Sequence, residues 1–450
     1  MSKSSVLLIN PWIADFAAYD LWAKPMGLLT VGKYLRHYGY DLQLIDLTDR
    51  ARWGGEKLSE NSSGRGKYHK TVIPKPPAVA HVPRQFGLYG ATPGQFTAAL
   101  SRIPPPKVIF VTSHMAYWYP GVLETIRVLR ATFPESKIVL GGTYATLFPD
   151  HAQKTLEPDE LITGYGEKAS LIIADRIFGI NRDYSNIPET LDNGLLPWDL
   201  YRKISVAALL TSRGCPMHCD YCATPFLNPR FTQRLPNDVI NEIKYLYHEM
   251  NIREFAFYDD ALFVNKRKHI IPILSGIIAE NIKANFHTPN GLFAREIDRE
   301  LAGLMKTSGF KTVRLSLESV APEILRQSTG KVSTSKFERA LIALEQAGFR
   351  RCQIETYLIM GIPGQNYEDV EKSIRFVYDC GAVSRLASYS PIPNTPLWET
   401  AKKAGFVHED MDPLLTNNTL YPCSTPDFPV EKFAELRQLS NDYNATVRKK

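Results

Sequence analysis

Short apolar and β-branched runs alternate with longer stretches of helical periodicity through residues 1–170. Runs with the length and composition of strands lie at 6–10, 42–46, 108–113, 137–140 and 160–163. Helical patterns at 28–37 and 121–132 lie between them and are followed by the stop signals Gly39 and Pro134. Strands that alternate with helices in this way predict a parallel, doubly wound α/β sheet.

A second series of strand and helix patterns begins near residue 205. Its strands are predicted at 206–210, 254–258, 284–288, 312–317, 353–359 and 384–388. Helical patterns separate them at 237–248, 270–282, 296–307, 335–347 and 367–380. Six strands with connecting helices predict a partial (β/α)6 barrel of TIM-like type, whose functional site is expected at the carboxyl ends of the strands.

Three segments outside these two series complete the predicted domain organisation. The region 48–107 is far longer than an ordinary connection, and its aromatic residues and the helical stretch at 93–100 favour an ordered insertion over a disordered linker. Residues 183–204 contain Pro188 and Pro197 and are predicted to be a linker. We therefore expect a first domain at 1–182, a barrel at 205–398 and a C-terminal helical extension at 399–450.

The composition is that of an ordinary globular protein, because 44% of the 450 residues are hydrophobic and 22% are charged. The 53 basic and 47 acidic residues leave a net charge of only +6, which argues against a nucleic-acid partner. The longest apolar stretch contains Pro272 and Glu280 and is too short to span a membrane. Six cysteines are too few for a disulfide framework, and no signal peptide is recognisable, so we expect a cytoplasmic protein.

Three of the six cysteines, Cys215, Cys219 and Cys222, lie within one short loop at C-x3-C-x2-C spacing. Thiolates at this spacing can bind three irons of a [4Fe-4S] cluster, which leaves one iron without a protein ligand. The alternatives are a structural zinc knuckle or three ordinary thiols. Structural zinc normally takes four ligands, and no second Cys or His pair follows the loop.

This loop resembles that of the radical S-adenosylmethionine (radical SAM) superfamily, with the aromatic Tyr221 directly before the last cysteine. The resemblance implies that the open iron chelates the amino and carboxylate groups of SAM. One electron from the cluster would then cleave the sulfonium to a 5'-deoxyadenosyl radical. It also implies an electron donor such as flavodoxin or ferredoxin.

Polar and glycine residues at the predicted strand ends of the barrel are candidates for binding SAM. Asp259 and Asp260 follow the second strand, where they either accept hydrogen bonds from the SAM ammonium or are solvated loop carboxylates. Alternate positions of the fourth strand share one face, and we expect their polar side chains at the barrel mouth. Asn290 and Gly291, after the third strand, are candidates for the substrate side. The SAM-binding candidates are Tyr221, Asp259, Asp260, Arg314, Ser316, Glu318, Gly361 and Pro363.

The strand ends of the first domain resemble those of the cobalamin (vitamin B12)-binding, Rossmann-like domain that precedes the barrel in a large radical SAM subfamily. Segments 8–11, 25–29, 139–146 and 163–167 carry the resemblance. The cobalt-ligating histidine of B12 mutases has no counterpart in 11–16, and the radical SAM subfamily commonly lacks it too. The resemblance implies cobalamin as a cofactor, with candidate contacts at Asn10, Thr112, Ser113, Gly141, Gly142, Thr143, Gly164, Gly166 and Glu167.

We interpret the chain as a radical SAM enzyme whose leading reaction is cobalamin-dependent methylation of an unactivated carbon in a small-molecule or natural-product-like substrate. The alternative is a radical elimination, cyclisation or dehydrogenation in which the first domain is a scaffold. A non-catalytic corrinoid or iron-sulfur binding protein is a third interpretation. Cys423 is a candidate hydrogen-atom donor, although free cysteines are more often buried packing residues.

Overall fold

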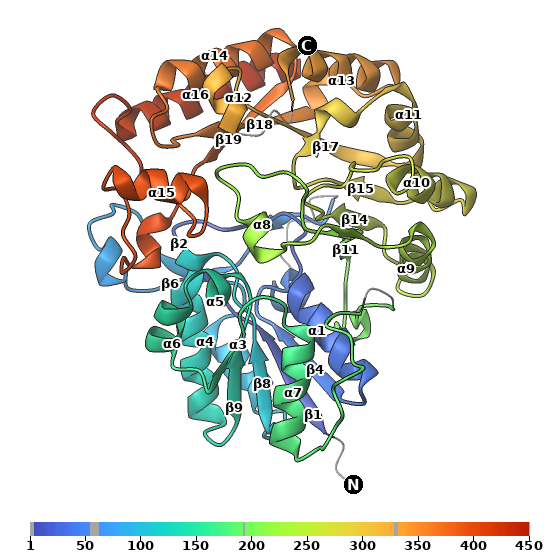
Figure 1. Cartoon of the computed structure of the whole chain (residues 1–450), viewed down its shortest axis with the longest axis vertical. Helices are drawn as coiled ribbons and strands as arrows, with labels where there is room; N and C mark the ends of the chain where they lie inside the picture. The colour runs from blue at the N-terminus through green and yellow to red at the C-terminus, as the bar shows by residue number, and fades with distance from the viewer. Residues whose placement is uncertain (1–3, 55–62, 192–193, 328–331, 450) are drawn as a thin grey trace. The chain divides into compact units, whose positions relative to one another are not determined.

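The computed structural model describes residues 4–54, 63–191, 194–327 and 332–449 of the chain (Figure 1). The chain forms two compact units. Unit 1 comprises Met1–Ser205 and Asp410–Leu415, and unit 2 comprises Val206–Glu409 and Thr416–Lys450. Residues 55–62 of the expected insertion and 192–193 of the expected linker lie outside the described residues.

Unit 1 is built on a five-stranded parallel sheet in the order β10-β9-β8-β1-β4. The strands are β1 (Ser5–Asn10), β4 (Asp41–Asp46), β8 (Val108–Val111), β9 (Lys137–Leu140) and β10 (Glu160–Leu161). Its helices are α1 (Met26–His37), α2 (Arg50–Trp53), α4 (Tyr119–Thr132), α5 (Thr143–Leu147), α6 (Pro149–Leu156) and α7 (Glu167–Phe178). Val6 to Ile9 are at most 1% exposed, as expected of a strand covered on both faces. The predicted doubly wound sheet is confirmed.

The described part of the long region between β4 and β8 is ordered. Its strands β6 (Lys70–Val72) and β7 (Gly87–Tyr89) form an antiparallel sheet with β2 (Ile13–Asp15), in the order β2-β7-β6. A second ribbon pairs β5 (Gly66–Lys67) with β3 (Tyr19–Asp20). The helix α3 (Pro93–Leu100) begins with a capping box between Thr92 and Gln95. The region is therefore joined to the chain that follows β1.

Unit 2 contains six parallel strands in the order β11-β14-β15-β17-β18-β19, and the short β16 (Leu292–Phe293) also pairs with β17. The strands are β11 (Val206–Leu209), β14 (Glu254–Phe257), β15 (Asn285–His287), β17 (Phe310–Glu318), β18 (Ile354–Met360) and β19 (Val383–Ser388). The connecting helices are α9 (Pro236–His248), α10 (Ile270–Ala279), α11 (Arg299–Ser308), α13 (Thr334–Gln346) and α14 (Tyr367–Asp379). This arrangement matches the predicted partial barrel.

The two faces of the unit 2 sheet differ in chemistry. Phe255, Phe257, Phe286 and Phe310 stack on one another, with neighbouring ring centroids 5.4–6.0 Å apart, and are at most 3% exposed. The alternate positions carry polar side chains, including His287, which contacts Glu254 and Thr312 at 2.7 and 2.9 Å. Because successive strand residues point to opposite faces, one face forms the apolar core and the other can carry polar chemistry.

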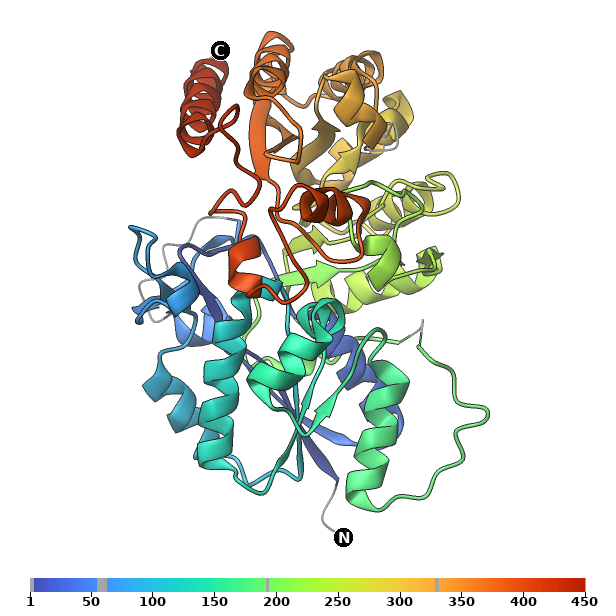
Figure 2. The ribbon, with the colours of Figure 1, turned by 60° about the vertical axis from the view of Figure 1, so that its left-hand side comes forward.

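The C-terminal helix α16 (Val430–Lys449) is part of unit 2, where it packs against α14 and β19 (Figure 2). The Asn444 side chain accepts a hydrogen bond from the Ser384 backbone N–H and donates one to its carbonyl, both at 2.9 Å. Ser440 and Ser384 share a hydrogen bond between their hydroxyls. Since β19 ends the sheet order, α16 covers an edge strand. The expected extension 399–450 is thus divided, because Asp410–Leu415 belongs to unit 1.

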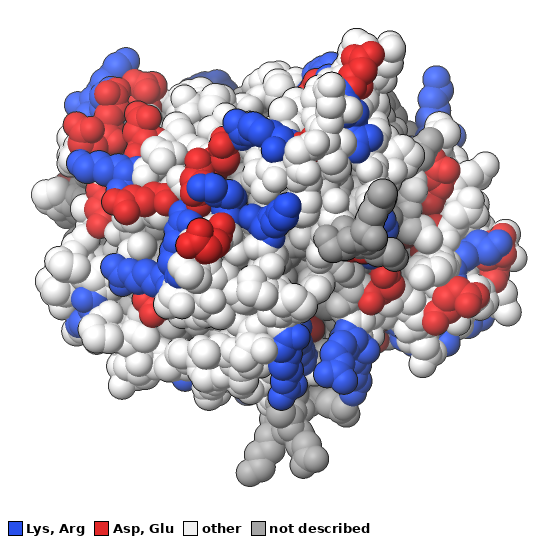
Figure 3. All heavy atoms as spheres, turned by 90° about the horizontal axis from the view of Figure 1, so that it is seen from below, with Lys and Arg blue, Asp and Glu red and all other residues white. Residues whose placement is uncertain are grey.

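Acidic and basic side chains are mixed on the face shown in Figure 3. Ion pairs between exposed residues, such as Lys244–Glu280 at 2.8 Å, are spread over the surface. Within the described residues, none of the helices combines the length and apolar character that crossing a membrane requires.

The turn after β9 contains a glycine whose backbone conformation and close packing can be tested by substitution. Gly142 has a φ of 101°, and a Cβ on it would lie 2.2 Å from the carbonyl oxygen of Ser113. We expect Gly142→Ala to destabilise the protein by about 2 kcal/mol or more, because it adds backbone strain and a clash. The measurement is the midpoint of thermal unfolding. Gly94→Ala is the control, since Gly94 lies in α3 with open space around it; equal midpoints for the two variants would contradict the prediction.

Candidate functional site

The loop that carries the three cysteines is closed at its base by a short antiparallel ribbon. β12 (Ser212–Arg213) pairs with β13 (Thr232–Gln233), so the intervening residues leave and re-enter at one point. Gly214 has a φ of 79°, and a Cβ on it would lie 3.0 Å from the Asn228 and Arg230 carbonyl oxygens. A glycine is therefore required where the loop doubles back on itself.

All three cysteines line a single cavity of about 290 Å³ in unit 2. The other lining residues are Met217, Thr224, Asp260, Pro289, Asn290, Gly291, Phe293, Ser316 and Tyr357. Cys219 is 3% exposed, and all six cysteines are free thiols. The described residues contain no three His, Cys, Asp or Glu side chains that converge on a single metal ion. A [4Fe-4S] cluster does not require such convergence, because each cysteine binds a different iron.

Backbone groups of the loop are placed to support thiolates. The N–H of Met217 donates to the Cys215 sulfur at 3.4 Å, and the N–H of Thr224 donates to the Cys222 sulfur at 3.4 Å. Hydrogen bonds to the sulfurs stabilise the charged form that binds iron. The donor set and its surroundings fit an iron-sulfur cluster with one open coordination site.

The two adjacent aspartates after β14 point in different directions. Asp259 is 4% exposed, and its Oδ1 accepts hydrogen bonds from Thr211 N, Thr211 Oγ1 and Ser212 Oγ at 3.0, 2.8 and 2.5 Å. Asp260 is exposed and lines the cavity. Asp259 therefore holds the turn that leads into the cysteine loop, and Asp260 is the carboxylate that a ligand in the cavity would meet.

A further part of the cavity wall is formed by Pro289, Asn290 and Gly291. The Asn290 side-chain amide donates to the Tyr258 carbonyl oxygen at 2.8 Å, which ties this segment to the end of β14. A Cβ on Gly291 would lie 2.0 Å from the Ser316 hydroxyl oxygen. Ser316 thus reaches the cavity beside the backbone of this segment, as its position on the polar face of β17 predicts.

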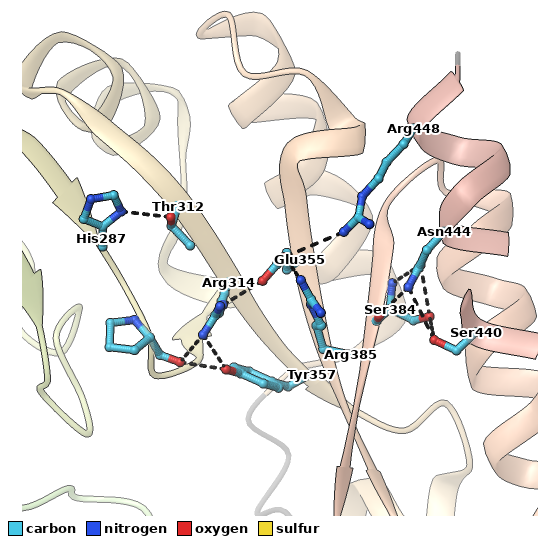
Figure 4. A network of polar contacts seen from close by, with 11 residues as sticks. His287, Thr312, Arg314, Glu355, Tyr357, Ser384, Arg385, Ser440, Asn444 and Arg448 are labelled. Carbon is cyan, nitrogen blue, oxygen red and sulfur yellow. Dashed lines mark hydrogen bonds and ion pairs between the residues drawn. The ribbon is translucent and has the colours of Figure 1, made fainter. Parts of the chain in front are cut away.

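Arg314 supports this wall and does not line the cavity (Figure 4). Its side chain is 4% exposed and donates to Glu355 Oε2 at 2.7 Å, to the Tyr357 hydroxyl at 3.0 Å and to the Pro289 carbonyl at 3.3 Å. Burial alone would raise the pKa of Glu355. The hydrogen bond from Arg385 and the charge of Arg314 outweigh burial and hold this pKa below its ordinary value. Arg314 was expected to face SAM, but its guanidinium is occupied by Glu355 and Tyr357.

The remaining SAM candidates of unit 2 lie outside the residues that line the cavity. Glu318 ends β17 with a φ of 69°. Burial, and after it the charge of the nearby Glu318 and Cys219, raise the pKa of the Tyr221 phenol. A Cβ on Gly361 would lie 2.5 Å from the Phe433 ring of α16, so the absence of a side chain at Gly361 makes room for this ring. Pro363 lies two residues further along the chain. Asp260 and Ser316 are the predicted SAM residues that the cavity includes.

Thr224 and Tyr357 line the cavity but were not predicted from the sequence. Tyr357 pairs with Ser316 in the register of β17 and β18, so the alternation that identified Ser316 could also have identified Tyr357. Cys423 lies outside the cavity lining and is 4% exposed, and burial raises the pKa of its thiol to about 12. Its surroundings favour the interpretation as a packing residue.

The cobalamin candidates lie at the carboxyl ends of the unit 1 strands, where parallel sheets bind ligands. Asn10 donates to Asp46 Oδ1 at 2.7 Å and to Thr48 Oγ1 at 2.9 Å, so its amide is used within the protein. Ser113 is 3% exposed and donates to the Gly141 carbonyl at 2.7 Å. Both shape the edge of the sheet.

The other candidates at this edge differ in how open they are. Glu167 is 3% exposed, at the start of α7, and Gly166 packs near Val31. Gly164 is exposed, and a Cβ on it would meet no atom within 4 Å. The half-buried positions are Thr112, Gly141, Gly142 and Thr143.

The buried Arg314–Glu355 pair supplies a test of how the cavity wall is held. We expect Arg314→Met to lower the free energy of unfolding by about 2 kcal/mol or more, because it removes the buried hydrogen bonds to Glu355, Tyr357 and Pro289, although Arg385 still contacts Glu355. Adding Glu355→Gln should restore part of this loss, as urea unfolding would measure. Lys244→Met breaks an exposed ion pair with Glu280 and should cost less than about 1 kcal/mol. A similar loss for both single variants would contradict the assignment.

Comparison with known proteins agrees with this geometry. The family model described as "Radical SAM superfamily" matches residues 209–377. Cytidylyl-2-hydroxyethylphosphonate methyltransferase of Streptomyces wedmorensis is 23% identical, over 89% of this chain and 82% of its own length. An uncharacterized methyltransferase of Pyrococcus horikoshii is 30% identical, over 66% of this chain and 69% of its own length.

Two solved structures share the fold of the whole chain. The radical SAM methyltransferase TsrM from Kitasatospora setae, with cobalamin and a [4Fe-4S] cluster bound, superposes with a TM-score of 0.66 at 16% identity, over 90% of this chain and 76% of its own. The cobalamin-dependent radical SAM enzyme OxsB, in its apo form, gives a TM-score of 0.58 at 13% identity, over 98% of this chain and 61% of its own. This chain belongs to the radical SAM superfamily.

Proposed function

We propose that this protein methylates an unactivated carbon of a small-molecule substrate, with a [4Fe-4S] cluster and SAM in unit 2 and cobalamin in unit 1. The observation that carries the proposal is the cavity in which three cysteines, Asp260 and Ser316 meet at the carboxyl ends of the strands. Methyl transfer is supported by the relative from S. wedmorensis, because the match extends over most of both chains.

The residues of unit 2 have separate tasks in this proposal. Cys215, Cys219 and Cys222 hold the cluster, which when bound with SAM supplies the electron that cleaves the sulfonium to a 5'-deoxyadenosyl radical. Asp260 is placed to accept hydrogen bonds from the SAM amino group, and Ser316, beside the wall formed by Pro289, Asn290 and Gly291, is placed to donate one to SAM. Tyr357 donates to the Pro289 carbonyl at 2.7 Å and keeps that wall in position.

The residues of unit 1 are proposed to bind cobalamin through backbone and small side chains. Gly141 and Gly164 leave the strand ends of β9 and β10 open to close approach by a large ring, with Thr143 beside them, whereas Gly142 allows the turn to pack against the Ser113 backbone. Fixed Asn10 and Ser113 side chains would keep this edge in shape before the ligand arrives. We assign residues 1–182 to this domain, 183–204 to a linker, 205–398 to the barrel and 399–450 to its extension, apart from Asp410–Leu415, which belongs to unit 1.

We further propose a cytoplasmic location and an electron donor such as flavodoxin or ferredoxin, because free thiols persist in a reducing compartment and the reaction begins with one electron. In the alternative reaction, the protein forms the 5'-deoxyadenosyl radical but transfers no methyl group, and the product arises by elimination, cyclisation or dehydrogenation. It is favoured by the similarity to the anaerobic magnesium-protoporphyrin IX monomethyl ester cyclase of Rubrivivax gelatinosus, which is 23% identical over 61% of this chain.

Removing one cluster ligand tests the radical generator. We expect the anaerobically reconstituted wild-type protein to contain about four irons per chain and to form 5'-deoxyadenosine from SAM and dithionite. Cys219→Ala should lose most of the iron and at least 100-fold of the 5'-deoxyadenosine formation, on the order of 3 kcal/mol. Cys380→Ala is the control, since this cysteine lies at the end of α14. Unchanged product formation by Cys219→Ala would contradict the proposal.

A larger side chain at the carboxyl edge of the unit 1 sheet tests cobalamin binding. A Cβ on Gly141 would meet no atom closer than 3.7 Å, so Gly141→Leu should fold and project its side chain into the proposed corrin site. After reconstitution with hydroxocobalamin, the wild-type protein should retain a corrinoid absorption band through gel filtration, and the variant should lose at least tenfold in affinity, about 1.4 kcal/mol. A wild-type protein without this band would remove methyl transfer and leave the alternative reaction.

A further inference from the structure

The loop that follows β8 lies where the strand order of the unit 1 sheet reverses. In the order β10-β9-β8-β1-β4, the chain runs from β1 to β4 on one side and then crosses to β8 on the other. Sheets of this kind bind ligands beyond the carboxyl ends of the two strands that flank such a crossing. At the end of β1, Asp46 and Thr48 already hold the Asn10 amide. The loop after β8 is therefore well placed to supply a side chain that meets a ligand.

His114 is exposed in this loop, three residues after β8 ends. Its ring contacts that of Trp118, with the two centroids 6.0 Å apart. Within the part of the chain that the structure describes, neither of its ring nitrogens has a hydrogen-bond partner. By contrast, His151 of the same unit shares a hydrogen bond with the Tyr144 hydroxyl at 2.6 Å. Imidazole is the commonest side-chain ligand of metal ions, and His114 has both nitrogens available for that task.

The position of His114 is fixed by the residues on either side of it. The preceding Ser113 donates from its hydroxyl to the Gly141 carbonyl at 2.7 Å. Four residues further along, Trp118 Nε1 donates to Asp15 Oδ2 at 2.7 Å, so the ring that contacts His114 is itself held in place. Outer partners of this kind orient a metal ligand before the metal binds. His114 is thus joined to the strand end of β9, next to a glycine proposed to approach cobalamin.

The surface beside His114 suits a large ring with an apolar face. The side chain of Met115 is 41% exposed, and it is followed by the short helix η2 (Ala116–Trp118). A Cβ on Gly141 would meet no atom closer than 3.7 Å, and one on Gly164 would meet none within 4 Å. Ligand sites combine mostly apolar surface with a few polar groups that fix orientation. The residues present therefore fit a corrin ring that carries a metal ion at its centre.

We propose that His114 ligates the cobalt of cobalamin on the face of the corrin that is turned toward the unit 1 sheet. One ring nitrogen donates its electron pair to cobalt, and the benzimidazole base or water that held the position leaves intact, so nothing is oxidised or reduced. The cobalt-ligating histidine of B12 mutases has no counterpart in 11–16, and His114 supplies the ligand from a different strand. The identity of an axial ligand tunes the reactivity of a metal cofactor. This inference rests on the proposed function, since it requires cobalamin in unit 1.

The test is electron paramagnetic resonance (EPR) of wild-type protein that has been reconstituted with hydroxocobalamin and reduced to the cobalt(II) state by dithionite. An axial nitrogen splits each cobalt line into a triplet, and nitrogen-15 gives a doublet instead. Because the benzimidazole base of cobalamin also contains nitrogen, the protein is labelled with nitrogen-15 histidine and the cofactor is left unlabelled. Spectra are recorded at liquid-nitrogen temperature, where the signal of a reduced [4Fe-4S] cluster is too broad to interfere. We expect doublets from the labelled protein.

A pair of variants identifies the histidine. His114→Phe keeps a ring beside Trp118 but removes both nitrogens, so it should lose the doublets and about tenfold in affinity for hydroxocobalamin. His37→Phe is the matched control, because His37 is also exposed in unit 1 and its ring also contacts a neighbouring aromatic ring, that of Tyr38, at 4.9 Å. His37 ends α1, just before β4 begins, and thus lies at the amino edge of the sheet. This control should keep both the doublets and the affinity.

Each other outcome contradicts a defined part of the account. Triplets from the labelled wild-type protein would assign the position to the benzimidazole base, and a spectrum without nitrogen splitting would assign it to water or to no ligand. Either result would overturn the inference, as would doublets that persist in His114→Phe. The labelling experiment uses the wild-type protein, so it decides the question even where His114→Phe fails to fold. A wild-type protein that retains no corrinoid would instead contradict the proposed function.

Discussion

The hydrogen bonds that converge on Asp259 Oδ1 fix the point from which the cysteine loop starts. Thr211 and Ser212 donate three hydrogen bonds to this buried oxygen, and the ribbon of β12 and β13 closes directly behind them. Burial raises the pKa of Asp259, against the lowering effect of these donors, which marks how far the carboxyl group lies from solvent. These hydrogen bonds hold the Asp259 side chain within the protein, whereas the adjacent Asp260 lines the cavity. One anchored side chain thereby positions both the cluster loop and the carboxylate beside it.

Buried polar side chains of unit 2 fix the part of the cavity wall that contains Pro289. Arg314 bridges Glu355 and Tyr357, and Tyr357 holds the backbone of Pro289 in place. A buried ion pair of this kind contributes little net stability compared with apolar packing, but it is costly to break and fixes geometry. The pair therefore holds this part of the cavity wall in one geometry. In unit 1, hydrogen bonds to Asp46 and Thr48 likewise fix the geometry of the Asn10 side chain.

Local patterns in the sequence predicted the strands, most helices and the cysteine loop, because each depends on residues a few positions apart. Alternation along β17 correctly placed Ser316 at the cavity. It could not separate Ser316 from Arg314, whose partner Glu355 lies 41 residues further along the chain. Nor could it reveal that Phe433 of the C-terminal helix fills the space beside Gly361. Contacts between distant segments decide which polar residues are structural and which face a ligand.

We propose that one chain combines a SAM-derived radical with methyl transfer through cobalamin. The most direct measurement is the amount of 5'-deoxyadenosine and S-adenosylhomocysteine formed from SAM in one anaerobic mixture, with and without hydroxocobalamin. We expect both products when cobalamin is present, because one SAM is cleaved to the radical and a second donates its methyl group. Formation of 5'-deoxyadenosine alone, unchanged by cobalamin, would contradict it.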